Sequence, residues 1–255
     1  MRFASLGSGS EGNGLVVSVA DTHLLLDCGF GLKDSVTRLA RLGLTPEQLS
    51  GILVTHEHGD HCDGVAKLAR KYSLPVWLTH GTQRSAAKVF AGLTTQREID
   101  PHQPFAIGDI QLHPYPVPHD AAEPVQFVFS DGQRRLGVLT DAGCSTPHIV
   151  AMLSGCDALV LECNHDADLL ANSEYPHSLK QRISGRLGHL DNQQAADLLA
   201  QLATDRLQHL VAAHLSQRNN TATLAIAALS QVLNCAPDWI GIADQARGFD
   251  WREIN

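Results

Sequence analysis

The sequence predicts an α/β protein in which two β-sheets are covered by helices on their outer faces. Three observations lead to this fold class. The chain opens with β-rich segments, and each half then passes into strands interspersed with amphipathic helices. No linker or low-complexity stretch separates the halves, and no repeat of fixed period is present. We therefore expect a single domain spanning residues 1–255.

The first half of the chain contains the predicted elements that precede a motif rich in histidine and aspartate. A strand at residues 2–7 is followed by a glycine-rich loop, and two β-rich runs then meet in a hairpin at Ala20-Asp21-Thr22. Apolar residues at helical spacing predict a helix within residues 33–43, and the run GILVTH returns to a strand. The later elements of this half are a helix starting at Val65, a strand at 75–79, a helix at 81–92 and strands within 105–117.

The second half repeats the alternation of strands and helices. Its predicted strands cover residues 124–130, 135–140, 157–163 and 209–214, each an apolar or β-branched run. Its predicted helices cover residues 176–185, 192–203 and 219–233. Asp191 lies where it can cap the second of these helices.

Composition and charge limit the classes of function. The formal net charge is -8, which opposes the sequence-independent attraction to phosphate that long nucleic-acid grooves use, so any nucleic-acid contact should be local. The six cysteines form no C-x-x-C pair, as expected of reduced thiols in a cytosolic protein. No apolar run approaches the length of a membrane span, so we expect a soluble cytoplasmic protein with no membrane partner.

The segment THEHGDHCDG, residues 55–64, directly follows an apolar strand and carries histidine and aspartate at close spacing. A surface loop can gather such residues because they are polar, but this placement at a strand end favours metal binding. His56 and His58 are two residues apart in an extended segment, so both can face one ion. Asp60 and His61 are adjacent and suit a neighbouring ion, which favours two metals.

Two ions need more ligands than this loop supplies, and three distant residues offer them. His119 follows a proline-rich extended run, while Asp141 and His214 each end an apolar strand. Each one alone is equally consistent with a polar residue where a strand meets solvent. Their shared placement at strand ends makes all three candidate ligands.

Together these residues resemble the metallo-β-lactamase superfamily, through T-H-x-H-x-D-H and the later His, Asp and His at strand ends. The segments SLGSGSEGN, LECNHD, EYPHSLKQRISGRLGHLDN and HLSQRNN resemble more narrowly its YycJ/WalJ branch, with features of tRNase Z. The resemblance implies a four-layer αββα sandwich. It also implies two divalent ions: His56, His58 and His119 would hold the first, Asp60, His61 and His214 the second, and Asp141 would bridge them.

The resemblance also implies the reaction. The bridging position is a cysteine in the zinc lactamases and an aspartate, Asp141, here, as in the phosphodiesterase and glyoxalase branches. We therefore expect a metal-dependent phosphodiesterase, most similar to DNA exonucleases, with zinc as the first candidate and manganese or iron as others. Thioester or lactone hydrolysis, and a metal-bound sensor or partner-binding protein, are the alternatives.

Five further residues, and Asp60 a second time, receive roles in this interpretation. Asp27, at a strand end, would orient a ligand or the attacking water, although it could equally serve a turn. Asp60 would also accept a hydrogen bond from a hydroxide bridging the ions, and His189 would contact phosphate and act as general acid. Three basic residues of one locally cationic segment are candidates to bind the substrate phosphate, and the alternative is that they form a solvated helix face: Lys180, Arg182 and Arg186.

Overall fold

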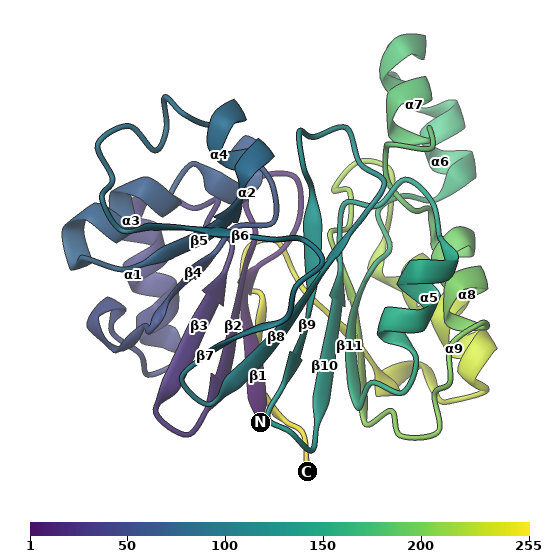
Figure 1. The fold of residues 1–255 in the computed structure, drawn as a ribbon. Coiled ribbons are helices and arrows are strands. Elements are labelled where there is room, and N and C mark those ends of the chain that lie inside the picture. Colours follow the sequence, from purple (N-terminus) through teal and green to yellow (C-terminus); the bar gives the residue numbers. More distant parts are fainter.

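A computed structural model describes all 255 residues. Two sheets of seven strands each form its centre (Figure 1). The first sheet contains β1 (Arg2–Gly7), β2 (Gly14–Val19), β3 (Thr22–Leu26), β4 (Gly51–Leu53), β5 (Val76–Thr79), β6 (Gln96–Ile99) and β14 (Phe249–Glu253). The second contains β7 (Phe105–Ile107), β8 (Ile110–Pro116), β9 (Val125–Ser130), β10 (Arg135–Leu139), β11 (Ala158–Glu162), β12 (His209–Ala213) and β13 (Ile240–Ile242).

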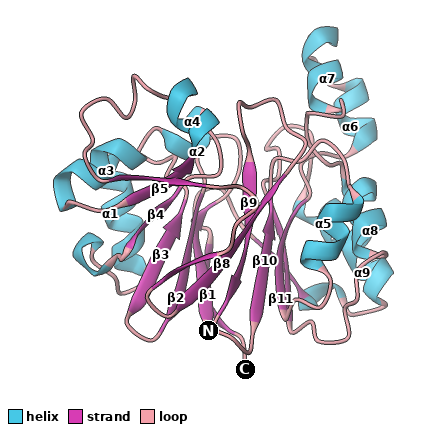
Figure 2. Ribbon diagram, viewed as in Figure 1, coloured by secondary structure: helices cyan, strands magenta, loops and turns pink.

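Helices cover the outer face of each sheet, which confirms the four-layer αββα arrangement (Figure 2). Beside the first sheet lie α1 (Leu32–Arg41), α2 (Gly59–Cys62), α3 (Val65–Tyr72) and α4 (His80–Ser85). Beside the second lie α5 (Pro147–Leu153), α6 (Ala167–Asn172), α7 (His177–Ile183), α8 (Asn192–Leu199) and α9 (Ala222–Leu233). Short 3₁₀ turns occupy Pro46–Gln48 and Pro237–Trp239. No helix is both long and apolar enough to cross a lipid bilayer.

The apolar side chains fall into three buried layers, as the sandwich requires. One layer lies between the sheets and includes Phe3, Leu24 and Phe127, all fully buried. The other two lie between each sheet and its helices. Because the central strands are buried on both faces, their sequences are nearly continuous apolar runs, which is why they could be recognised.

The directions of the strands bring polar residues together at one edge of the sandwich. In the first sheet β3, β4 and β5 are parallel, with the order β14-β1-β2-β3-β4-β5-β6. In the second sheet β10, β11, β12 and β13 are parallel, with the order β13-β12-β11-β10-β9-β8-β7. The carboxyl ends of parallel strands share an edge, so residues that follow them meet there.

Most predicted elements are confirmed, and Asp191 caps α8 by accepting a hydrogen bond from the Gln194 amide. The helix expected over residues 81–92 was wrong in its second half, because α4 ends at Ser85. The turns that follow bring Phe90 and Leu93 into the core, and their burial overrides the local helical preference. Six elements were not predicted from the sequence: α2, β6, α5, α6, β13 and β14.

Candidate metal centre

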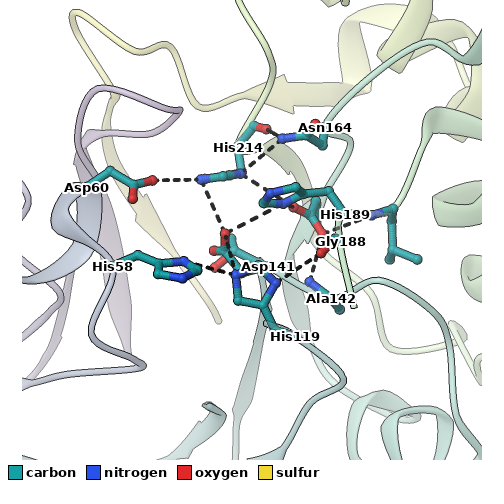
Figure 3. Close-up of polar contacts among 12 residues, drawn as sticks. His58, Asp60, His119, Asp141, Ala142, Asn164, Gly188, His189 and His214 are labelled. Atoms are coloured by element: carbon teal, nitrogen blue, oxygen red, sulfur yellow. Dashed lines mark hydrogen bonds and ion pairs between the residues drawn. The ribbon is translucent and has the colours of Figure 1, made fainter. Parts of the chain in front are cut away.

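All seven residues expected to bind metal meet where the carboxyl edges of the two sheets face each other. Figure 3 shows five of them pointing toward a common centre. His56 and His58 follow β4, and α2 contributes Asp60 and His61. The second sheet supplies the residues that follow β8, β10 and β12, namely His119, Asp141 and His214.

The first group consists of three imidazole nitrogens. The Nδ1 atom of His58 lies 3.1 Å from Nε2 of His56 and 3.2 Å from Nε2 of His119. Nitrogens bound tetrahedrally to one zinc ion are about 3.3 Å apart, because each Zn–N bond is about 2.0–2.1 Å long. The three rings therefore have the spacing that a single cation requires.

The second group brings one carboxylate to two imidazoles. Asp60 Oδ2 lies 3.4 Å from Nε2 of His61 and 3.4 Å from Nε2 of His214. Both histidines are buried, whereas the Asp60 side chain is 23% exposed and forms part of the open side of the centre. This spacing again suits one cation held by oxygen and nitrogen.

Asp141 lies between the two groups. Its Oδ2 atom is 3.2 Å from His61 Nε2, and its Oδ1 atom is 3.5 Å from His214 Nε2 and 3.9 Å from His119 Nε2. Oδ2 is also buried without a hydrogen-bond partner. A buried carboxylate oxygen of this kind is costly unless it is neutralised, so the residues present fit a pair of divalent cations.

A second ring of contacts fixes the imidazoles. His61 donates from Nδ1 to Asp27 Oδ2 at 2.9 Å, which leaves its Nε2 free to face Asp60 and Asp141. Asp27 accepts two more hydrogen bonds from Thr55, one from the amide and one from the hydroxyl. His119 donates from Nδ1 to the Gly188 carbonyl at 3.0 Å. Such outer contacts set the tautomer and orientation of a metal-binding histidine.

Three residues of the centre have strained backbones. Asp27, Asp141 and His214 have φ values of 61°, 55° and 55°, in the left-handed region that non-glycine residues seldom adopt. Each lies just beyond a parallel strand, where the chain turns away from the sheet. Strain of this kind persists where the surrounding structure fixes it, and it is concentrated at functional sites.

The electrostatics of the centre favour bound positive charge. Burial alone would raise the pKa of Asp141, but the imidazoles of His214 and His61 hold it well below the ordinary value. Burial opposes the charged form of His214, yet Asp141, Asp60 and Glu162 raise its pKa to about 10. In the other group, burial and neighbouring imidazoles lower the pKa of His56, which keeps that ring neutral and able to bind metal.

The structure adds Glu162 and places it with His189. Glu162 is the last residue of β11, is fully buried, and has a pKa lowered to about 2, because His189 outweighs the effect of burial. Its Oε1 atom accepts from His189 Nδ1 at 2.8 Å, and its Oε2 accepts from the amides of Ala142 and Leu190. An ionisable residue ending the apolar strand DALVLE was the signal that could have identified it.

Asn13 is a second residue that the sequence analysis missed. Its Nδ2 atom donates to Asp60 Oδ2 at 3.3 Å, and its Oδ1 accepts from the Gly9 amide and the Ser8 hydroxyl. The Ser8 hydroxyl in turn accepts from the His214 amide at 2.9 Å. The glycine-rich loop between β1 and β2 therefore connects two residues of the second group, and its asparagine was the available signal.

The three basic residues expected to bind phosphate differ in their contacts. Arg182 donates from Nε to Asp120 Oδ2 at 2.6 Å, and Lys180 donates to the Ala171 carbonyl at 2.7 Å. Arg186 is exposed and forms no hydrogen bond or ion pair through its side chain. It is therefore the cation best placed to accept a new partner.

Comparisons with known proteins show the family to which this chain belongs. A family model described as a β-lactamase superfamily domain matches residues 22–214. The exodeoxyribonuclease YycJ of Bacillus anthracis is 37% identical over 91% of this chain and 89% of its own length. The exodeoxyribonuclease WalJ of Streptococcus pneumoniae is 33% identical over 88% of this chain and 85% of its own.

Among solved structures, the metallo-β-lactamase fold protein YhfI of Bacillus subtilis superposes with a TM-score of 0.76. It is 18% identical, and the match covers 98% of each chain, so this likeness concerns the fold alone. The family model and the two homologues extend the agreement to sequence. The chain therefore belongs to the metallo-β-lactamase superfamily and, within it, is a homologue of the YycJ and WalJ exodeoxyribonucleases.

Proposed function

We propose that this chain is a dinuclear metal-dependent phosphodiesterase that degrades DNA from its ends. The observation that carries the proposal is the pair of donor groups sharing Asp141, with His189 beside them. The homology to YycJ and WalJ supports DNA as the substrate. An aspartate at the shared position also supports phosphodiester rather than lactam chemistry.

The donors suit two divalent cations. His56, His58 and His119 would hold one, Asp60, His61 and His214 the other, and Asp141 would contact both. Imidazole with carboxylate is the ligation that zinc prefers, and manganese and iron accept the same donors. Such a pair of ions lowers the pKa of a water molecule toward neutrality and neutralises charge on the phosphate.

The residues of the chain would orient the reactants. Asp60 directs Oδ2 toward His61 and His214, which leaves Oδ1 to accept a hydrogen bond from the attacking water. Glu162 holds the Nδ1 proton of His189, so the Nε2 side of this partly exposed ring can donate to a phosphate oxygen or to the leaving alkoxide. Burial lowers the pKa of His189, but Glu162 more than reverses this effect, so the proton-donating form is favoured.

The net charge of -8 fits a substrate bound at its end. A chain end needs only a few phosphate contacts, whereas an extended duplex would be repelled by an acidic surface. Exposed Arg186 would supply one of those contacts. Arg182, which is paired with Asp120, would hold the adjacent edge of the site in place. We propose that the DNA end is bound through a few phosphate contacts beside the metal centre.

The proposal is tested by metal analysis together with hydrolysis assays on purified protein. We expect close to two ions per chain and cleavage of bis-p-nitrophenyl phosphate and of end-labelled single- or double-stranded DNA. Asp141→Asn, which preserves shape, should lower both activities at least about a hundredfold and reduce bound metal. Asp205→Asn, at an exposed carboxylate, is the matched control and should change neither. Cleavage of thioesters or lactones by the metal-loaded wild type, without cleavage of any phosphodiester, would refute the proposal.

A further inference from the structure

Leu187 is an apolar side chain exposed at the rim of a polar centre. Its exposed fraction is 54%, whereas the other three exposed large hydrophobic residues of the chain are 36–40% exposed. Exposing a leucine forgoes the stabilisation that its burial would give. No element of the fold covers it, so its contribution to folding is small.

The loop that carries Leu187 is rigid. It joins α7 to the segment before α8, and its backbone is held by hydrogen bonds from the Gly188 amide to the Gly185 carbonyl and from the His189 amide to the Ile183 carbonyl. A Cβ atom at Gly188 would lie 2.1 Å from the Ile183 carbonyl oxygen, so the loop is tightly folded around glycine. A rigid loop presents an exposed side chain at little entropic cost.

The same loop is built into the wall of the metal centre. The Leu187 carbonyl accepts from the Asp120 amide at 3.0 Å, and the next carbonyl, that of Gly188, accepts from the ring of His119. His189 follows directly, and Figure 3 shows Gly188 and His189 beside Asp141. Leu187 therefore directly precedes Gly188, whose carbonyl contacts His119, and lies two residues before His189.

Cations flank this single apolar side chain. Arg186 directly precedes Leu187 in the sequence and is exposed. Arg182, four residues before Arg186, lies on α7 and forms an ion pair with Asp120. Exposed cations beside an isolated apolar side chain match a nucleotide, which offers a charged phosphate and a flat apolar base face. A protein partner would be favoured by a wider apolar patch, which the charged neighbours interrupt.

We propose that Leu187 is a specificity-determining residue that packs against the nucleobase adjoining the scissile phosphodiester and so positions the DNA end. This inference rests on the proposed nuclease function and deepens it. It assigns base contact to Leu187, while His189 and the metal centre act on the phosphate. A substrate without a base gains nothing from this contact.

The experiment compares single-turnover cleavage of normal oligonucleotides and of matched ones with an abasic nucleotide beside the scissile bond. Metal-loaded wild type should cleave the normal substrate about fivefold faster, the effect expected of a partly buried leucine contact. Leu187→Ala should remove this preference by slowing only the normal substrate. Leu187→Phe should retain it, and the abasic oligonucleotide should be cleaved equally by all three proteins.

The control is Leu224→Ala, at a leucine of α9 that is 37% exposed, and it should behave as wild type. Equal discrimination by wild type and Leu187→Ala would overturn the inference while leaving the nuclease function intact. An equal loss on the normal and the abasic DNA would also overturn it, because the defect would lie in the centre itself. Wild type that cleaves none of these diesters would refute the proposed function and this inference with it.

Discussion

The contact between Glu162 and His189 shows how one buried residue can set the role of a partly exposed one. One carboxylate oxygen of Glu162 accepts hydrogen bonds from two backbone amides, and the other accepts one from the imidazole of His189. It therefore cannot rotate, and the imidazole is held in one tautomer. At the residue scale, the proposed proton donor His189 depends on a partner that is fully buried.

Glu162→Gln should lower the rate of DNA cleavage by about 10- to 100-fold, because the amide keeps the shape but no longer stabilises the proton of His189. A double variant that also carries His189→Ala should be no slower than His189→Ala alone, as expected if Glu162 acts through the ring. Cleavage rates, with bound metal measured in parallel, check this. Additive losses in the double variant would contradict the positioning role.

At the element scale, the centre is assembled by strand ends rather than by any one segment. Residues following β3, β4, β10 and β12 converge because the parallel strands of both sheets direct their carboxyl ends to one edge. The loops must then approach one another closely. Gly29 shows this, since a Cβ atom there would lie 1.9 Å from the Asp60 carbonyl oxygen.

Gly29→Ala should therefore displace α2 and with it Asp60 and His61. We expect a loss of about 1–3 kcal/mol in the free energy of unfolding and at least about tenfold weaker metal binding. Denaturant unfolding and metal titration measure the two effects. Gly31→Ala is the control, because its added Cβ has open space and its backbone is extended. Unchanged metal affinity in Gly29→Ala would show that the loop carrying Gly29 shifts to accept the methyl group without displacing Asp60 or His61.

At the scale of the whole molecule, the two ends of the chain meet in one sheet, where β1 pairs with β14. The layer between the sheets draws on residues from both halves of the sequence. We therefore propose that residues 1–255 form one cooperative unit. The metal centre joins the two sheets at their edge, so bound ions should stabilise the sandwich as a whole.

Adding zinc to metal-free protein should raise the unfolding temperature in a single transition. At free zinc one hundred times the dissociation constant, each bound ion contributes about 2.7 kcal/mol, or roughly 5–10 °C for a chain of this size. Calorimetry measures the shift, which Asp141→Asn should reduce. His80→Ala, at an exposed histidine paired with Glu98, should retain it. Two separate transitions would argue against one unit, and an unchanged temperature against the metal centre.

The sequence alone predicted the sandwich class, most of its strands and helices, and the seven candidate ligands. Strand periodicity and metal-binding residues at strand ends are local signals, so they can be read along the chain. Glu162 and Asn13 could not be assigned in this way, because their roles depend on neighbours far along the chain: His189 for Glu162 and Asp60 for Asn13. The shortened α4 was misjudged for the same reason, since the burial of Phe90 is a tertiary effect.

The sequence therefore predicted the chemistry proposed for this protein, because several histidine and aspartate residues at strand ends together favour metal binding. Only the tertiary structure decided that Glu162 and Asn13 contact the centre, which cations are already engaged, and that Leu187 remains uncovered beside it. These outcomes depend on distances between segments that are remote in sequence. Packing of the two sheets sets those distances, and no single segment encodes them.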